Sequence, residues 1–436
     1  MKAGFSRVKI TPPLGTTMMG FGARDMEHGC SGVHDDIYVR AVYAEQSGEA
    51  ALIMGFDLCF LGRVESDRFK GAIGRVLDLA PRQILLNTTH NHVGPSVGIW
   101  YSAGFEPPDR LYLEELERAT VQAAGLARGN AQEVTLWAGQ TRSALPMNRR
   151  RPSEDGKIYM RPNPPGLVYD KIPMVLFKNL RGDPVCLLFS VSAHPSMMSG
   201  FEISAEYPGA IMTRLDRNLG QTVSLFLQGV GGDAKPSVIG GDIEYWRPGT
   251  WELMDQAGAM VAAEIRAALD NGLQEIEPRL RSATVEMIWP LRPAPSRAVF
   301  EQTITETPPD KRNQDIKCRW ATRQIELLDR RGFLPDSAPI GIHGVQLGIG
   351  LRIIGMEGEA VAEWGQIIDQ FYDGGITFPL GYTDGTGLYL PTSKMLDEGG
   401  YEVYSFWEYG YPAELAPGME DIVLDALRNL RDNGIS

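Results

Sequence analysis

Cysteine is scarce in this sequence, and its placement argues against one class of metal site. The four cysteines, Cys30, Cys59, Cys186 and Cys318, lie far apart, and no two of them form a CxxC pair. Structural zinc sites built from cysteine normally use such closely spaced pairs. We therefore expect four reduced, mostly buried thiols, as is typical of a cytoplasmic protein.

Long apolar runs and an excess of basic residues are also missing. No run approaches the ~18–20 residues that span a bilayer, and residues 1–7 lack the apolar core of a signal peptide. The chain carries 42 Lys and Arg against 55 Asp and Glu, a net charge of −13. A nucleic-acid partner requires a basic face. We therefore expect a cytoplasmic protein with neither nucleic-acid binding nor stable membrane insertion.

Strand-like apolar runs alternate with amphipathic helical patterns along the 436 residues. This alternation predicts an α/β protein with mixed β-sheets flanked by helices. The main expected strands are 37–45, 51–56, 83–86, 185–191, 223–227 and 351–355, and the main expected helices are 64–77, 109–126, 208–219, 250–269 and 413–430. Residues 142–170, rich in Arg, Pro and Asn, predict a long loop. Residues 293–335 predict a surface hairpin or cover, helical at 315–331.

The stretch Asn87-Thr88-Thr89-His90-Asn91-His92-Val93-Gly94-Pro95 holds two of the six histidines in the chain. An apolar strand precedes it, and its Gly-Pro pair predicts a turn. Because side chains two residues apart lie on the same side of an extended segment, His90 and His92 can point into one cavity. They are then either a metal ligand and a substrate-contacting neighbour, or a hydrogen-bonded structural pair.

Two further strand ends offer metal ligands. His194 follows an apolar strand in Ser192-Ala193-His194-Pro195, and Glu359 follows another in Met356-Glu357-Gly358-Glu359. Catalytic zinc sites use about three protein ligands and keep one position open for water. The spacing does not choose between Glu357 and Glu359. Together the histidines and one carboxylate favour a zinc-dependent hydrolase.

Several short motifs, in order along about the whole chain, resemble those of the neutral/alkaline (non-lysosomal) ceramidase family. The segments that resemble family motifs are Thr89–Pro95 (T-H-x-H-S-G/A-P), Asn148-Arg149, Ala193-His194-Pro195, Gly232–Pro236 (G-D-V-S-P), Gly358-Glu359, Tyr389-Leu390-Pro391-Thr392 and Tyr401-Glu402. The resemblance implies a single neutral-ceramidase-like catalytic domain over residues 1–436, without the C-terminal immunoglobulin-like domain of the family.

The resemblance also implies roles for individual residues. Zinc would be held by His90, His194, Glu359 and Tyr389. The substrate carbonyl and its oxyanion would be oriented by His92, Arg149 and Tyr401. Tyrosine is an unusual zinc ligand, and without the resemblance Tyr389 would be interpreted as a packing residue.

One departure from the family pattern concerns the substrate. The serine of the G-D-V-S-P motif is Lys235 here, beside Asp233. We interpret these two residues as substrate-binding, with Lys235 facing a carboxylate or another anion. The alternative is an ion pair of Lys235 with Asp233 or Asp242.

These observations predict a zinc-dependent amidohydrolase that uses metal-activated water. Its substrate would be a small polar molecule, with an anionic one as an option, and ceramide itself is not expected. Ester or lactone hydrolysis at the same zinc site and a non-catalytic ligand-binding homologue remain as alternatives. A homo-oligomer is compatible with the sequence.

Overall fold

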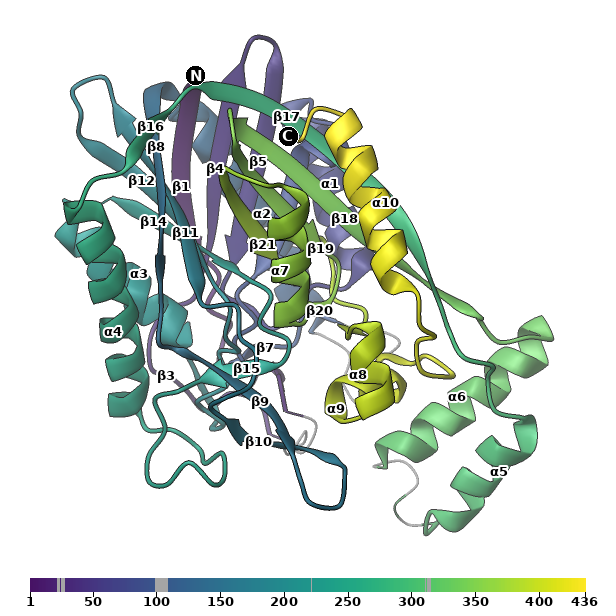
Figure 1. The fold of residues 1–436 in the computed structure, drawn as a ribbon. Coiled ribbons are helices and arrows are strands. Elements are labelled where there is room, and N and C mark those ends of the chain that lie inside the picture. The colour runs from purple at the N-terminus through teal and green to yellow at the C-terminus, as the bar shows by residue number, and fades with distance from the viewer. Residues whose placement is uncertain (22–23, 25–27, 99–108, 221, 310, 312–314) are drawn as a thin grey trace.

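Two β-sheets pack face to face at the centre of the molecule (Figure 1). The computed structural model describes residues 1–436 except 22–23, 25–27, 99–108, 221, 310 and 312–314. The large sheet runs in the order β14 (Val223–Gln228), β12 (Pro184–Val191), β11 (Lys171–Asn179), β8 (Gln132–Arg142), β1 (Lys2–Lys9), β4 (Tyr38–Gln46), β5 (Glu49–Phe56) and β6 (Ile84–Thr88), and β16 (Gln274–Ile276) also pairs with β8. The small sheet runs in the order β17 (Pro278–Pro290), β18 (Ser337–Gly348), β19 (Leu351–Met356) and β21 (Ile376–Leu380).

The apolar strands bury both of their faces, which explains why their sequences are continuous apolar runs. In β12, Cys186 and Leu188 point into the core between the sheets, while Leu187 and Phe189 point toward helices. In β19, Ile353 faces the inter-sheet core and Ile354 faces the opposite side. Successive side chains of a strand alternate in this way. The predicted mixed sheets flanked by helices are therefore confirmed.

Helices cover the outer face of each sheet. The large sheet is covered by α1 (Arg63–Leu77), α2 (Arg110–Gly129), α3 (Glu206–Asn218) and α4 (Trp251–Asp270), and the small sheet by α7 (Ala362–Phe371) and α10 (Met419–Asp432). The Asp109 carboxylate accepts from the backbone N–H of Leu111 at 2.8 Å and caps α2. Thr250 caps α4 in the same manner. These caps satisfy backbone donors that have no partner within the helix.

Two predicted boundaries are wrong. Residues 142–170 are not one loop, because β9 (Pro146–Pro152) and β10 (Ile158–Asn163) form a hairpin that pairs with β15 (Ala234–Pro236). Pairing with a distant strand creates this structure, so local composition does not reveal it. The final helix begins at Met419 rather than at residue 413, because Leu415 is held extended in a bridge with Leu291.

A helical hairpin, α5 (Arg297–Glu306) and α6 (Ile316–Arg331), stands beside the sheet layers (Figure 1). Its own small core, centred on Phe300 and Trp320, packs against the short helix η2 (Ser405–Tyr409) through Phe406 and Trp407. The expected surface hairpin is therefore present, and it contacts a segment that leads into the site described below.

The carboxyl ends of parallel strands meet at one edge of the two sheets. β5 pairs in parallel with β6, β12 with β14, and β19 with β21. Isolated bridges join Asn87 to Thr383 and Gly229 to Leu380, so strand ends of both sheets are held together. This edge is where open α/β sheets place their ligands.

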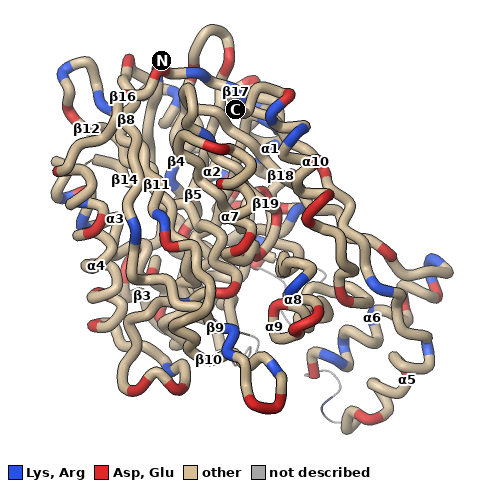
Figure 2. The backbone as a smooth tube through the Cα atoms, in the orientation of Figure 1, with Lys and Arg blue, Asp and Glu red and all other residues tan. Residues whose placement is uncertain are grey.

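Charge and hydropathy of the described residues add two observations. Lys and Arg are interspersed with Asp and Glu along the chain in the view of Figure 2, and no large basic face is visible there. Among the described helices, none has the length and apolar character needed to cross a membrane.

Candidate metal centre

Three strand ends bring His90, His194 and Glu359 together. His90 follows β6, His194 follows β12, and Glu359 begins β20 (Glu359–Ala360) just after β19. The Oε2 atom of Glu359 lies 3.3 Å from Nε2 of His90 and 3.1 Å from Nε2 of His194. All three side chains are only 1% exposed. The donor atoms therefore converge on one buried point, where a single ion could contact all of them.

Backbone carbonyls fix the tautomer of both histidines. Nδ1 of His90 lies 3.0 Å from the carbonyl oxygen of Cys59, and Nδ1 of His194 lies 2.7 Å from that of Gly231. Because a carbonyl oxygen only accepts, both Nδ1 atoms carry the proton. Each neutral ring then presents the lone pair of Nε2 to the common point. Metal-ligating histidines are normally oriented by such a second hydrogen bond.

The His90 backbone is itself strained. Its φ is 63°, in the left-handed region that non-glycine residues rarely adopt, and Tyr382 across the site has a φ of 53°. The rings of these two residues lie 4.4 Å apart. Such strain persists where surrounding structure imposes it, and it clusters at functional sites. Here it turns the His90 ring inward instead of along the strand direction.

Tyrosine hydroxyls complete the donor set around Glu359. Tyr389 lies in β22 (Tyr389–Leu390), which pairs in parallel with β20 so that Tyr389 is directly opposite Glu359. Its hydroxyl is 3.2 Å from Nε2 of His194. Tyr382 donates to Oε2 of Glu359 at 3.2 Å, and Tyr409 donates to Oε1. The fourth predicted ligand, Tyr389, thus lies next to His194 and opposite Glu359.

The charge balance of this cluster suits a cation. Burial lowers the pKa of His90 to about 3 and also lowers that of His194, so both rings stay neutral. Burial alone would raise the pKa of Glu359, but His90, His194 and Tyr409 lower it to about 2. Two lone pairs and one carboxylate therefore surround the same point. Two imidazole nitrogens with carboxylate and phenol oxygens are a donor set that fits zinc.

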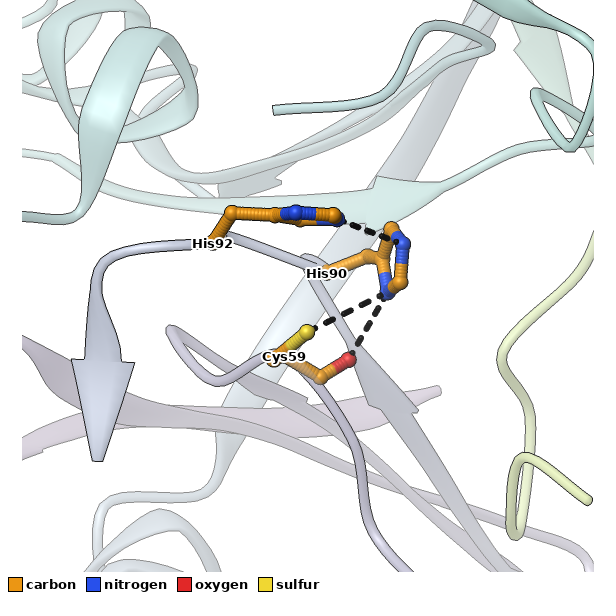
Figure 3. Close-up of side chains that lie close together, drawn as sticks. All are labelled: Cys59, His90 and His92. Atoms are coloured by element: carbon orange, nitrogen blue, oxygen red, sulfur yellow. Dashed lines mark hydrogen bonds between the residues drawn. The ribbon is translucent and has the colours of Figure 1, made fainter. Parts of the chain in front are cut away.

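A second histidine grouping, Cys59 with His90 and His92, is also close enough to hold an ion (Figure 3). Burial raises the pKa of the Cys59 thiol well above its ordinary value, so the thiolate that a metal requires is disfavoured. Nδ1 of His90 is also already bound to the Cys59 carbonyl. The geometry therefore favours the set with His194 and Glu359, and it leaves Cys59 as the residue that orients His90.

His92 lies beside the converging donors without facing Glu359. Its Nε2 is 3.0 Å from Nε2 of His90, while its buried Nδ1 has no hydrogen-bond partner in the described part of the chain (Figure 3). Burial is the main cause that lowers its pKa well below the ordinary value, and the neighbouring His90 and His194 rings act in the same direction. His92 is therefore a neutral ring with a free nitrogen at the edge of the site.

Arg149 reaches the centre from β9. It donates to the Tyr389 hydroxyl at 3.0 Å, and its Nη1 lies 3.3 Å from Nε2 of His194. A buried ion pair with Glu402, at 2.8 Å, holds the guanidinium in place. The ring of Tyr401 lies 5.5 Å from that of Tyr389 and 5.6 Å from the Arg149 guanidinium carbon. The structure thus brings Arg149 and Tyr401 to one side of the metal centre.

The two predicted substrate-binding residues have different environments. The Asp233 carboxylate is fully buried, and it accepts from the Ala362 N–H at 2.8 Å and from Asn148 at 3.3 Å. Asp242 pairs with Arg247, so neither aspartate takes the ion pair that the sequence offered to Lys235. These bonds favour a structural role for Asp233, while Lys235 keeps a free ammonium group within the described chain.

The structure favours Glu359 over Glu357 as the candidate metal ligand. It also adds two tyrosines that the sequence did not single out. Glu357 turns away to bind Arg63 and the Gly341 N–H. Tyr382 and Tyr409 contact Glu359 from within a Gly- and Tyr-rich segment. The only sequence signal for these two tyrosines was that local richness, which does not indicate where a ring points.

Searches of family models and of curated proteins find no match to this sequence. Solved structures do match the fold. A neutral ceramidase from Pseudomonas aeruginosa aligns with a TM-score of 0.74 and 15% identity, covering 99% of this chain and 74% of that one. A ceramidase complexed with C2 aligns with a TM-score of 0.76 and 14% identity, covering 99% of this chain and 75% of the other. The chain therefore has the neutral-ceramidase fold.

Proposed function

We propose that the protein is a zinc-dependent hydrolase that cleaves the amide bond of a small polar substrate. The observation that carries this proposal is the convergence of Nε2 of His90, Nε2 of His194 and a Glu359 oxygen on one buried point. The neutral-ceramidase fold supports amide hydrolysis, since two structures with this fold are ceramidases. The two sheets act as one catalytic unit in this proposal, because each of them contributes ligands.

His90, His194, Glu359 and Tyr389 would hold the zinc. When bound, zinc lowers the pKa of a coordinated water and polarises a carbonyl oxygen. The protein contributes the geometry: Cys59 and Gly231 orient the two imidazoles, and the tyrosine hydroxyls fix the Glu359 carboxylate. Such supporting bonds matter because they hold ligands in place before the metal arrives.

Arg149, His92 and Tyr401 would act on the substrate. Arg149 donates hydrogen bonds at the rim of the metal centre and is held by the buried Glu402. Its guanidinium can donate to the carbonyl oxygen, on which negative charge develops as the bond is attacked. His92 and the Tyr401 hydroxyl would orient the same group. A well-placed oxyanion donor is worth about 3–4 kcal/mol.

Asp233 would position this donor. Its backbone carbonyl accepts from the Arg149 N–H at 2.9 Å, and its carboxylate ties the same strand to the start of α7. Asp233 therefore holds the Arg149 segment against the small-sheet side of the site. Lys235, two residues further on, is left as the candidate contact with the substrate.

The test is metal content combined with a substrate panel. Protein purified without added metal is assayed for zinc, and then for turnover of small amides, esters and lactones. We expect about one zinc per chain and amide hydrolysis that a chelator removes and zinc restores. The His90→Ala variant loses both zinc and activity, while His34→Ala, altered at a half-exposed ring stacked on Trp251, keeps both.

Other outcomes separate the alternatives. Turnover of esters or lactones without amides would replace the amide proposal at the same metal centre. A zinc-loaded protein without any acyl turnover would indicate a ligand-binding homologue. Retention of zinc and full activity in His90→Ala would reject the site itself.

A further inference from the structure

Lys235 carries an ammonium group that the described protein does not neutralise. It lies in β15, where Lys235 is opposite Met147 of β9. Its Nζ forms no hydrogen bond or ion pair with any described residue, and it lies 5.2 Å from the centroid of the Trp246 ring. The Lys235 side chain is only partly exposed, so its charge has neither full hydration nor a partner among the described residues.

Trp246 also has a hydrogen-bond donor without an acceptor among the described residues. Its indole Nε1 is buried and has no hydrogen-bond partner among the described residues. A comparable pair elsewhere in the fold does not share this feature: Lys178 lies 4.2 Å from the ring of Trp137, but that indole N–H donates to the Thr135 hydroxyl at 3.0 Å. Buried indole N–H groups normally find a partner. Lys235 and Trp246 are therefore two neighbouring donors for which the described part of the chain supplies no acceptor.

The backbone around Lys235 connects these donors to the metal centre. The carbonyl of Ala234, the preceding residue, accepts from the backbone N–H of His194 at 2.9 Å. Ala234 is also paired with Asn148, which precedes Arg149. The free donors thus adjoin both the proposed metal ligands and the proposed oxyanion donors.

Glu206 is the carboxyl group that could compete for Lys235. It accepts from the Met198 N–H at 2.9 Å, and its Oε2 has no partner in the described chain. Burial raises its pKa to about 8, so it is largely protonated at neutral pH. Burial also lowers the pKa of Lys235, to about 8, with Arg149 acting in the same direction. At pH 7 the lysine therefore remains mostly charged beside a mostly neutral acid.

We propose that Lys235 and the Trp246 N–H form a carboxylate-binding subsite, so that the substrate is a small amide bearing a free carboxylate. A carboxylate has two acceptor oxygens and can take one hydrogen bond from each donor. This inference rests on the proposed hydrolase function and names its substrate class. Hydrolysis consumes one water, breaks the C–N bond, and yields a carboxylic acid and an amine without any redox partner.

The carboxylate can belong to either product of the reaction. In an N-acyl amino acid it leaves with the amine, and in a monoamide of a dicarboxylic acid it stays with the acyl group. Both carry the same recognised group at a short distance from the scissile carbonyl. Two substrate pairs distinguish them: N-acetylglycine against N-acetylethanolamine, and succinamate against butyramide.

The experiment compares kcat/KM within each pair for wild type, Lys235→Met and Trp246→Phe. Hydrogen bonds to charged groups predict that wild type prefers the carboxylated member of one pair by about 10- to 100-fold. Lys235→Met should remove most of that preference, mainly through KM, and Trp246→Phe should reduce it by about 10-fold. Lys178→Met and Trp137→Phe are the matched controls and should leave the preference unchanged.

The preference ratio separates recognition from a structural role. The subsite is rejected if Lys235→Met lowers kcat/KM equally for both substrates of a pair. It is also rejected if wild type shows no preference in either pair. If the lysine variant does not fold, Trp246→Phe decides independently: an unchanged preference in that variant rejects the subsite, and a reduced one supports it.

Calorimetric titration with succinate and with N-acetylglycine tests the subsite without turnover. Wild type should bind at least one of them, and Lys235→Met should weaken that binding by about 10-fold or more. Binding that depends on Lys235, in a protein that hydrolyses no amide, would retain the subsite and reject the hydrolase. Absence of carboxylate binding in wild type would reject the subsite whatever the activity.

Discussion

Two buried clusters of this protein each combine histidine with a carboxylate, and they differ in what pairs with the carboxylate. In the cluster of Lys70, His343 and Asp384, both ring nitrogens of the histidine have a partner. Nδ1 of His343 lies 2.6 Å from Asp384, and Nε2 lies 2.9 Å from the Arg82 carbonyl. Lys70 forms an ion pair with the same carboxylate at 2.7 Å. The lysine thus places a positive charge beside the buried carboxylate.

The cluster of His90, His194 and Glu359 has no lysine or arginine paired with its carboxylate among the described residues. Its histidines use their protons on backbone carbonyls and direct their remaining lone pairs toward a carboxylate. A carboxylate paired with a lysine is typical of a structural core, whereas a buried carboxylate that faces imidazole lone pairs favours a cation. The comparison therefore favours the cluster without a lysine as the candidate ligand site.

The cluster of Lys70, His343 and Asp384 nevertheless supports the loop that carries His90. Asp384 accepts from the Leu86 N–H at 2.9 Å, and its own N–H donates to the Leu86 carbonyl at 2.7 Å. Leu86 lies in β6, the strand that leads into His90. The structural cluster therefore holds the strand that carries the first proposed ligand.

The largest effect is expected from substituting one histidine in each cluster. His194→Ala removes a proposed ligand, and we expect zinc content to fall and activity to drop more than about 100-fold, beyond the cost of losing an outer partner. His343→Ala should keep its zinc and show a lower Tm instead. Metal analysis and calorimetry of the two variants measure this contrast. Equal loss of zinc in His194→Ala and His343→Ala would contradict the assignment of only one cluster as a metal site.

Loss of Lys70 should be primarily a stability defect. Lys70→Met leaves Asp384 buried with only part of its charge compensated, and we expect the free energy of unfolding to fall by about 3 kcal/mol. Lys2→Met, at an exposed ion pair with Glu45, is the control and should change it by less than about 0.5 kcal/mol. Urea unfolding measures both. A zinc-dependent loss of activity without destabilisation would contradict the structural assignment.

Tyr409→Phe tests a supporting bond within the metal cluster. The substitution removes the hydroxyl that donates to Oε1 of Glu359 and keeps the ring. We expect zinc affinity or activity to fall about 10- to 100-fold. Tyr404→Phe, at a half-exposed ring, provides the control. If a zinc titration gives the same affinity for both variants, Tyr409 does not orient the ligand.

The smallest expected effect is on the pH dependence of the unfolding free energy. Burial alone would raise the pKa of Asp384, but Lys70 and His343 hold it well below its ordinary value. A carboxyl with a depressed pKa in the folded state stabilises the protein above its unfolded value, about pH 4, and this contribution declines as pH falls further. The difference in unfolding free energy between wild type and Lys70→Met should therefore narrow from about pH 7 to about pH 3. If the difference in unfolding free energy widens as the pH falls, the pKa of Asp384 is not lowered by Lys70 in the folded state.

The sequence predicts the layered fold well because the buried strands are visible as apolar runs. Residues such as Leu187 and Leu188 face opposite cores, so the whole strand is apolar and easily recognised. The hairpin of β9 and β10 was missed for the opposite reason. Its strands are defined by pairing with β15, far along the chain, where Asn148 lies opposite Ala234. Polar composition gives no sign of such long-range pairing.

Within the site, the sequence indicated residues that lie next to strand ends but not those that approach from elsewhere. His90, His194 and Glu359 each follow an apolar strand, which made them visible. Tyr409 lies 50 residues after Glu359, in a short helix whose orientation depends on the packing of α6. A contact of that kind follows from tertiary packing and has no local pattern.

The segment from Tyr401 to Tyr409 joins two functions in one short piece of chain. Glu402 holds both Arg149 and Arg150, and Tyr409 holds Glu359. The α5–α6 hairpin binds the residues that directly follow this segment. Trp320 donates to the Tyr411 carbonyl, and Gln324 donates to the Gly410 carbonyl. We therefore expect a change in the hairpin to affect the proposed substrate side and the proposed metal side together.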